Sequence, residues 1–202
     1  MNVEMLAALT GFAFVMSISP GPGNFLLLAS GANFGFRRSL PLLLGISSGF
    51  LTILFCVGLG LGALLQRHPE LHFFLRLGCG LYVLWLALRI ARSRSAGAAA
   101  DPGAARPITF LEAALLQIVN PKAWAVSLIV TVSYTRPEQF MASLLLLIAV
   151  FAMVNLPSLG VWVVSGSALR GMLAKGRRIA VFNVAMALLL VASMAPALLA
   201  SG

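Results

Sequence analysis

The residues best suited to chemistry surround two groups of prolines, one in each half of the chain. The first group is Ser19-Pro20-Gly21-Pro22-Gly23-Asn24, and the second is Asn120-Pro121-Lys122. Each proline removes an amide donor and clashes with the preceding helical turn, so both groups would interrupt a helix. An interrupted helix has free amides where its second half begins, and these suit a carboxylate. The carbonyls freed at the end of its first half suit an ammonium group, so the two groups together could bind a zwitterion.

Lys122 is a basic residue inside an otherwise apolar run. A charge at the centre of a membrane helix costs at least about 2.5 to 3.5 kcal/mol, so it is a functional candidate. It could bind a substrate carboxylate, or it could release its proton during a transport cycle. The structural alternative is that Lys122 pairs with Glu112 or caps carbonyls freed by Pro121.

Other polar side chains in apolar runs are candidates of the same kind. Glu112 could relay protons, or it could lie at the lipid headgroup boundary and contact Arg106. The amides near the proline groups can each donate and accept hydrogen bonds. They could therefore bind a zwitterion or satisfy an interrupted backbone; they are Asn24, Gln117, Asn120 and Asn155.

The sequence offers little for a metal, a cofactor or catalysis. His68 and His72 are four residues apart, but only Glu70 accompanies them, so no metal site is expected. Cys56 and Cys79 lie in apolar runs without Cys-x-x-Cys spacing, which argues against a disulfide scaffold. There is no phosphate-binding loop, Ser-His-Asp set or carboxylate pair, so we expect no cofactor and no enzymatic activity.

The elements that must position these residues are membrane helices. Of 202 residues, 60% are apolar and 9% are charged, and the mean hydropathy is +1.01. A soluble domain has about 25% charged residues, so a soluble, disordered or nucleic-acid-binding protein is excluded. The net charge of +9 comes from basic residues between apolar runs, where they act as signals for membrane topology.

Six apolar runs are long enough to span a membrane, which takes about 20 residues. They do not alternate as strands would, so they predict an all-α integral membrane protein. No basic segment precedes the first run, and its prolines argue against a cleaved signal peptide. The predicted spans are 4–35, 39–65, 71–91, 107–135, 139–168 and 178–200.

The spans divide into two halves of three, at 1–91 and 107–202, joined by a linker at 92–106. Three helices are an odd number, so the halves would have opposite orientations in the membrane. The first span of each half is interrupted near its middle, which predicts two inverted repeats with a transport site between them. The alternative is that proline and glycine merely kink these helices for packing.

A third interruption is expected in the fifth span, at Asn155-Leu156-Pro157. Its counterpart in the second span would be the small, polar segment from Gly45 to Gly49. Both segments could line a cavity or let helices pack closely.

The basic residues predict the orientation of the chain. Ten lie in the first, third and fifth loops and three in the second and fourth, which makes the odd-numbered loops cytoplasmic. Both termini would then face the outside of the membrane. The ten are Arg37, Arg38, Arg89, Arg92, Arg94, Arg106, Arg170, Lys175, Arg177 and Arg178, and the three are Arg67, Arg76 and Arg136.

The chain resembles the lysine exporter (LysE) family of translocators, in its homoserine/threonine resistance (RhtB) branch. The resemblance covers nearly the whole chain and departs from the family at Gly23, where an Asn or Asp is common, and at Leu111-Glu112, where a glycine is common. Its tyrosine–tryptophan stretch is similar to that of the cysteine and O-acetylserine exporters of the family. The motifs are Ser19 to Asn24, Gly35-Phe36-Arg37-Arg38, Gly45 with Gly49, Gly80 to Ala87, Asn120-Pro121-Lys122-Ala123-Trp124, and Asn183.

The resemblance implies a six-helix secondary exporter of amino acids or their derivatives, driven by an ion gradient that is usually of protons. With the residues above, it predicts alternating access around a small zwitterionic substrate in a lipid membrane, as a monomer or a homo-oligomer. Two alternatives are a metal-ion exporter of the wider superfamily and a membrane component that does not transport. The scarcity of His, Asp and Cys in the spans argues against the first.

Overall fold

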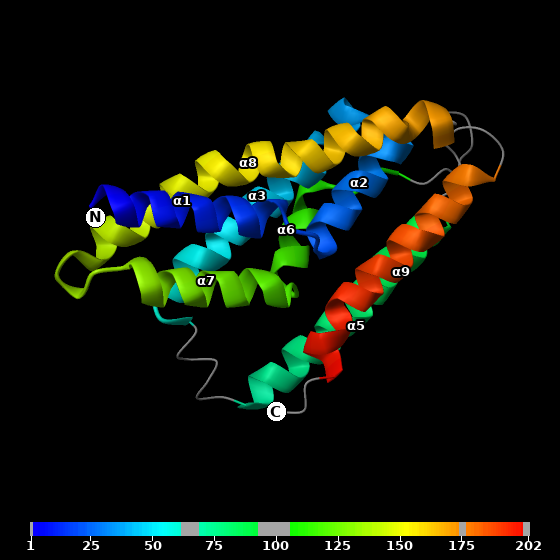
Figure 1. Ribbon diagram of the computed structural model, residues 1–202. Helices are drawn as coiled ribbons and strands as arrows, with labels where there is room; N and C mark the ends of the chain where they lie inside the picture. Colours follow the sequence, from blue (N-terminus) through cyan, green and yellow to red (C-terminus); the bar gives the residue numbers. More distant parts are fainter. Residues whose placement is uncertain (1, 62–68, 93–105, 174–176, 200–202) are drawn as a thin grey trace.

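The computed structural model describes residues 2–61, 69–92, 106–173 and 177–199, and all regular structure in these ranges is helical (Figure 1). Most of the predicted linker, His68, and the side chains of His72 and Cys79 lie outside the described part. The helices are α1 (Val3–Ile18), α2 (Pro22–Phe34), α3 (Phe36–Gly58), α5 (Pro69–Ala91), α6 (Phe110–Ile118), α7 (Pro121–Tyr134), the 3-10 turn η1 (Pro137–Gln139), α8 (Phe140–Leu173) and α9 (Arg178–Leu199).

Both predicted proline interruptions are present. α1 and α2 meet at an angle of 56°, and α6 and α7 meet at 65°, each across a short break. Pro22 begins α2 and Pro121 begins α7. Proline is tolerated at the first position of a helix, because the amide that it lacks would have had no partner there.

The third predicted interruption, at Asn155-Leu156-Pro157, is wrong. α8 runs as one helix of 34 residues through Pro157. A single proline costs one backbone hydrogen bond, and membrane helices tolerate that loss when neighbouring groups satisfy the freed carbonyl. The two groups that do break their helices combine proline with a second residue that ends or caps a helix, Gly21 in one and Asn120 in the other.

Four membrane spans are supported directly by helix length and apolar composition within the described ranges. α3 and α8 each pass alone, and the bent pairs α1–α2 and α6–α7 each pass as one span. Among the residues whose side chains are described, α5 and α9 contribute the shorter apolar helices Gly80–Ala91 and Arg178–Met194.

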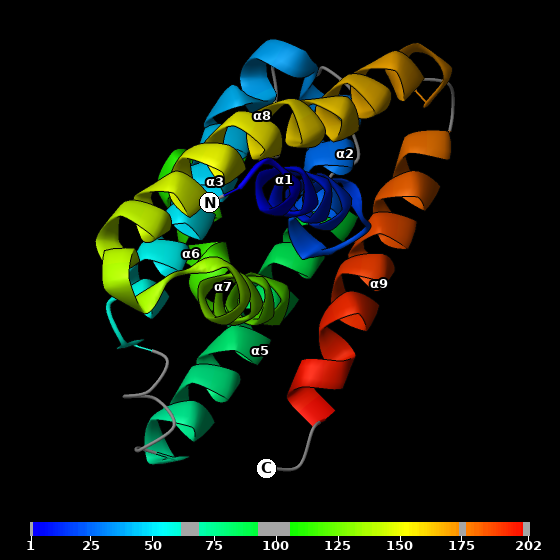
Figure 2. The ribbon, with the colours of Figure 1, turned by 60° about the vertical axis from the view of Figure 1, so that its left-hand side comes forward.

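The largest contacts between helices join one half of the chain to the other, rather than helices of the same half. α3 packs against α6 and α7, α8 packs against α1 and α2, and α5 pairs with α9 (Figures 1 and 2). Glycines allow the closest crossings. A Cβ on Gly31 or Gly166 would overlap backbone of the other helix at the α2–α8 crossing, and Gly45 and Gly49 of α3 approach the backbone of α6 in the same way.

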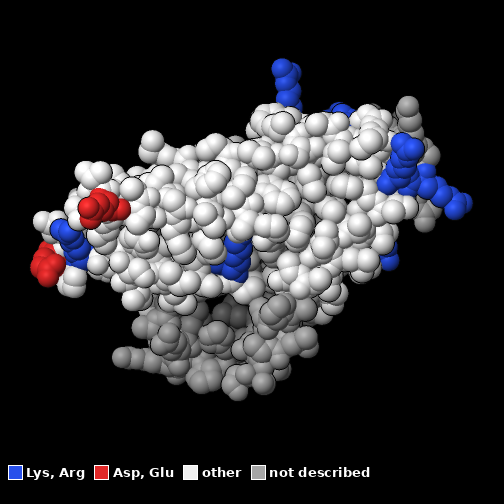
Figure 3. All heavy atoms as spheres, in the orientation of Figure 1, with Lys and Arg blue, Asp and Glu red and all other residues white. Residues whose placement is uncertain are grey.

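Charged side chains are few on the face that Figure 3 shows: Asp and Glu lie at its left end, and Lys and Arg lie at both ends, at the top edge and near the middle. Large apolar side chains such as Val132 (82% exposed) and Met153 (78%) point outward, as they do when lipid is the solvent. Basic side chains from α5, from α8 and from the segment before α6 lie near the end of α2. Arg170 lies beside Gly35, and Arg89 and Arg106 line one small cavity with Phe34.

Candidate functional site

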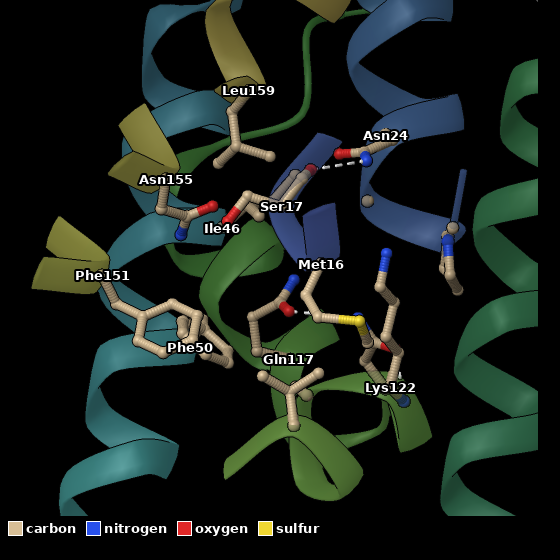
Figure 4. Close-up of a pocket in the computed structure, with 16 residues that line it drawn as sticks. Met16, Ser17, Asn24, Ile46, Phe50, Gln117, Lys122, Phe151, Asn155 and Leu159 are labelled. Atoms are coloured by element: carbon tan, nitrogen blue, oxygen red, sulfur yellow. Dashed lines mark hydrogen bonds between the residues drawn. The ribbon is translucent and has the colours of Figure 1, made fainter. Parts of the chain in front are cut away.

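A cavity of about 60 Å³ lies where the two interrupted helices meet (Figure 4). It separates two hydrophobic clusters, one that contains Ile46 and Leu159 and another that contains Phe50, Val126 and Phe151. Eight of the eleven predicted substrate-binding residues line the cavity, and they come from both halves of the chain: Gly21, Pro22, Gly23, Asn24, Gln117, Asn120, Lys122 and Asn155.

Three of the predicted residues do not line the cavity and lie in the breaks beside it. Pro20 and Pro121 belong to the breaks themselves, and Pro121 begins α7. Ser19 caps the end of α1 and reaches the site through Lys122.

The carbonyls freed at the end of α1 already have donors from the protein. Asn24 Nδ2 donates to the carbonyl oxygens of Ser17, at 3.0 Å, and Ser19, at 2.7 Å. Trp162 Nε1 donates to the carbonyl oxygen of Ile18 at 3.1 Å. A substrate ammonium group that binds these carbonyls, as the sequence predicts, would therefore compete with donors of the protein itself.

Lys122 connects the two breaks. Its Nζ donates to the Ser19 carbonyl oxygen at 2.9 Å and to Ser19 Oγ at 2.7 Å. The side chain passes over Gly21, where a Cβ would lie 3.2 Å from Lys122 Cδ. Lys122 therefore caps a freed carbonyl, but one of the first break and not of its own, and it makes no ion pair with Glu112 among the described residues.

The two helix starts at the cavity differ in their free amides. In α2, the first backbone hydrogen bond is donated by Phe25 N–H to the Gly21 carbonyl oxygen at 3.0 Å. The N–H groups of Gly23 and Asn24 have no acceptor within the described residues. In α7, Asn120 Oδ1 accepts from the Lys122 N–H at 3.1 Å.

The Asn120 carbonyl oxygen also accepts from the Ala123 N–H at 3.0 Å, which completes the cap of α7. The first N–H groups of α2 are therefore free to bind an anion, and those of α7 are not. The sequence pattern alone predicts free N–H groups at both helix starts.

Two further amides face the cavity from α6 and α8. Gln117 is 2% exposed, and its Oε1 accepts from Asn120 Nδ2 at 3.1 Å. Its Nε2 has no hydrogen-bond partner in the described structure. Asn155 is buried, lies near Ser47, and turns its side-chain oxygen toward Ser17 and Ile46 in Figure 4.

Glu112 lies outside the cavity, at the start of α6. Its Oε2 accepts from the Thr109 N–H at 2.7 Å, which forms a capping box with Thr109. Its Oε1 is paired with Arg89 at 2.8 Å and with Arg106 at 2.7 Å. The expected contact with Arg106 is present. These partners satisfy the hydrogen-bonding and charge of the carboxylate, so a structural role explains a glutamate at this position without a role in transport.

Sequence reasoning missed the apolar wall of the cavity. Phe50 and Phe151 have ring centroids 5.2 Å apart. Helical spacing is the signal that could have found them, because Phe151 and Leu159 each lie one turn from Asn155, and Phe50 lies one turn from Ile46. The apolar residues of the wall are Met16, Ile46, Phe50, Ala123, Val126, Phe151 and Leu159.

Comparisons with known proteins agree on one family. The family model described as LysE type translocator matches residues 14–201. A cysteine/O-acetylserine efflux protein of Escherichia coli (strain K12) is 29% identical over 194 residues, which are 95% of this chain and 96% of that protein. The protein of the same name in Shigella flexneri is 30% identical over the same shares.

A third protein of that name, from Salmonella typhimurium (strain LT2), is 34% identical over 123 residues, 60% of this chain and 61% of that protein. No solved structure matches the chain. The family match covers both breaks and every residue that lines the cavity, and the chain therefore belongs to the LysE type translocators.

Proposed function

We propose that the chain exports a small amino acid or amino-acid derivative across the bacterial cytoplasmic membrane, and that the cavity between the breaks binds the substrate. The observation that carries the proposal is the composition of this cavity. It joins polar groups of both interrupted helices in a chain of a translocator family. Interrupted helices that meet at depth are typical of transport sites.

The size of the cavity and the relatives favour a small substrate. A cavity of about 60 Å³ has room for roughly four to six waters, at about 10 to 15 Å³ for each. The relatives are named for efflux of cysteine and O-acetylserine. Cysteine and O-acetylserine are therefore the first substrates to test for this chain.

Alternating access between two inverted three-helix halves is the mechanism that we propose. In support, α3 packs on both parts of the α6–α7 pair, and α8 packs on both parts of the α1–α2 pair. An axis that relates two inverted halves would exchange these two sets of contacts. The hydrophobic clusters lie on either side of the cavity, so opening to one face of the membrane requires only one of them to separate. In this arrangement α5 and α9 complete the six spans.

Lys122 is the residue that we propose for coupling to protons. Its ammonium group ties α7 to Ser19 at the other break. Loss of the proton would leave a neutral amine, which holds the carbonyl less strongly than an ammonium group does. Protonation at this position could therefore be linked to the separation of the two breaks. Glu112 is the weaker candidate, because its carboxylate already has three partners outside the cavity.

Reconstituted transport tests the proposal. Purified protein in proteoliposomes should move radiolabelled L-cysteine or O-acetyl-L-serine, and an imposed pH gradient should accelerate the flux. Empty liposomes and Zn²⁺ flux are the two controls. Flux of Zn²⁺ without flux of either amino acid would favour the metal-exporter alternative and would contradict the proposal.

A further inference from the structure

The first turn of α2 faces a hydrogen-bond donor that the protein does not use. Gln117 Nε2 is buried and has no partner among the described residues. A Cβ on Gly23 would lie 3.8 Å from this nitrogen, so the amide group is directed at the start of α2. Figure 4 shows the nitrogen turned into the space that the labelled residues enclose.

The orientation of the Gln117 amide follows from a chain of hydrogen bonds. A backbone N–H can only donate, so Asn120 must turn Oδ1, and not Nδ2, toward the Lys122 N–H. Asn120 Nδ2 then donates to Gln117, which must present Oε1. The Gln117 Nε2 group is thereby left to face the cavity. Amide orientations are assigned from such networks, and here the network permits one assignment.

Three donors consequently converge on one side of the cavity. They are the N–H groups of Gly23 and Asn24, at the positive end of the α2 dipole, and the Nε2 group of Gln117. A buried donor without an acceptor is unfavourable, and a bound acceptor removes that cost. Because Gly23 has no side chain, a ligand can approach the backbone amides closely.

We propose that this side of the cavity is the subsite for the substrate carboxylate, and that Asn120 is the positioning residue that turns Gln117 toward it. The inference rests on the proposed function and states which group of the amino acid binds where. The anion goes to α2 and not to α7, because Asn120 closes the start of α7. Lys122 contributes positive charge nearby, but its ammonium group is held by Ser19.

Two substitutions at different residues should weaken the subsite for the same reason. Gln117→Glu keeps the shape and the acceptor for Asn120, but it places a second carboxylate oxygen where Nε2 was. Asn120→Asp keeps the cap on the Lys122 N–H but has no donor for Gln117. Gln117 would then turn Nε2 to residue 120 and leave its oxygen facing the cavity. Gln139→Glu on η1 is the matched control, because Gln139 is exposed and outside the cavity.

The experiment compares binding of L-cysteine and O-acetyl-L-serine with binding of their carboxamides, by calorimetry in detergent. The wild type should bind at least one acid about tenfold more tightly than its carboxamide. Gln117→Glu and Asn120→Asp should each weaken binding of that acid at least about tenfold and binding of the carboxamide less than about threefold. Retained carboxamide binding shows that the variants are folded. Gln139→Glu should match the wild type.

Three results would overturn the inference, and they are distinguishable. Equal binding of acid and carboxamide by the wild type removes the carboxylate subsite and leaves the proposed function intact. Unchanged acid binding by Gln117→Glu places the carboxylate elsewhere in the cavity. Binding of neither acid by the wild type contradicts the proposed function, and this inference falls with it.

Discussion

Lys122 bonds to a residue 103 positions away, at the break in the other half of the chain. A partly buried ammonium group needs acceptors, and Ser19 supplies a carbonyl oxygen and a hydroxyl oxygen to it. The residue therefore has a structural role in joining the breaks, and it also lines the cavity. A substitution that keeps the stem and removes the charge separates the two roles.

For Lys122→Met we expect a protein that inserts and stays monodisperse in detergent, because the apolar stem is retained. Export should fall at least about tenfold, which corresponds to about 1.4 kcal/mol of lost stabilisation. The measurement is initial flux in proteoliposomes at equal protein content. Export at the wild-type rate would contradict a part for Lys122 in transport.

Glu112→Gln should affect stability and not coupling. The substitution removes the charge that pairs with Arg89 and Arg106 and weakens the capping box with Thr109. We expect unfolding to become easier by about 0.5 to 2 kcal/mol, the usual range for a lost helix cap. Thermal unfolding in detergent measures this loss. Acceleration of flux by a pH gradient should remain, and its disappearance would return Glu112 to the proton pathway.

At the residue scale, the sequence predicted which polar side chains gather but not what each one does. The prolines indicate the two breaks, because proline inside a helix removes a backbone hydrogen bond. The charge indicates Lys122, because an ammonium group inside a membrane costs free energy. The unused donor of Gln117 was beyond prediction. It depends on the side chains of Asn120 and Gln117 forming a bond and on the direction in which that bond turns the amide.

At the element scale, the positions of the helices follow from the apolar runs, while their crossings depend on single glycines. Described helices overlap every one of the six predicted runs, but α3 begins three residues before its run and α8 ends five residues after its run. The sequence pattern wrongly predicted a break at Pro157, because a proline alone does not show whether a helix ends or continues. It left open whether the segment from Gly45 to Gly49 lines a cavity or permits packing. The segment does both, because Ile46 lines the cavity and the two glycines allow the close crossing of α3 with α6.

Gly166→Ala tests the crossing of α2 with α8. A Cβ at residue 166 would overlap the Leu28 carbonyl oxygen, so the helices must move apart. We expect a loss of stability of about 1 to 3 kcal/mol, as for other overpacked interiors. Gly160→Ala is the matched control on the same helix, since a Cβ there has no neighbour within 4 Å. The two variants are compared by thermal unfolding in detergent, and equal stability would mean that the crossing is looser than described.

At the scale of the whole molecule, the distribution of charge predicts how the protein sits in the membrane. Among the described residues, basic side chains from several helices lie near the end of α2: Arg89 and Arg106 line a cavity with Phe34, and Arg170 lies beside Gly35. The first turn of α1 carries Glu4 instead. By the positive-inside rule, we expect the basic end to face the cytoplasm.

Reporter fusions measure this orientation. An alkaline phosphatase domain, active only outside the cytoplasm, should be active at the C-terminus. A fluorescent protein that folds only in the cytoplasm should be dark there and bright when inserted in the 92–106 linker. A bright C-terminal fusion would mean that the number of spans or their direction is wrong.

The central claim is that the cavity between the breaks is the place where substrate binds and crosses, and Gly23→Val tests it most directly. A Cβ at residue 23 would lie 3.3 Å from Ile46 Cδ1 and would point into the cavity, so a branched side chain there fills the site. Gly11→Val makes the same change on α1, where a Cβ has no neighbour within 4 Å.

The measurement is the initial flux of the transported amino acid in proteoliposomes for the wild type and both variants. We expect Gly23→Val to lose at least about tenfold in rate. Gly11→Val should stay within about twofold of the wild type, as exposed substitutions usually do. A folded Gly23→Val protein that transports at the wild-type rate would contradict the account.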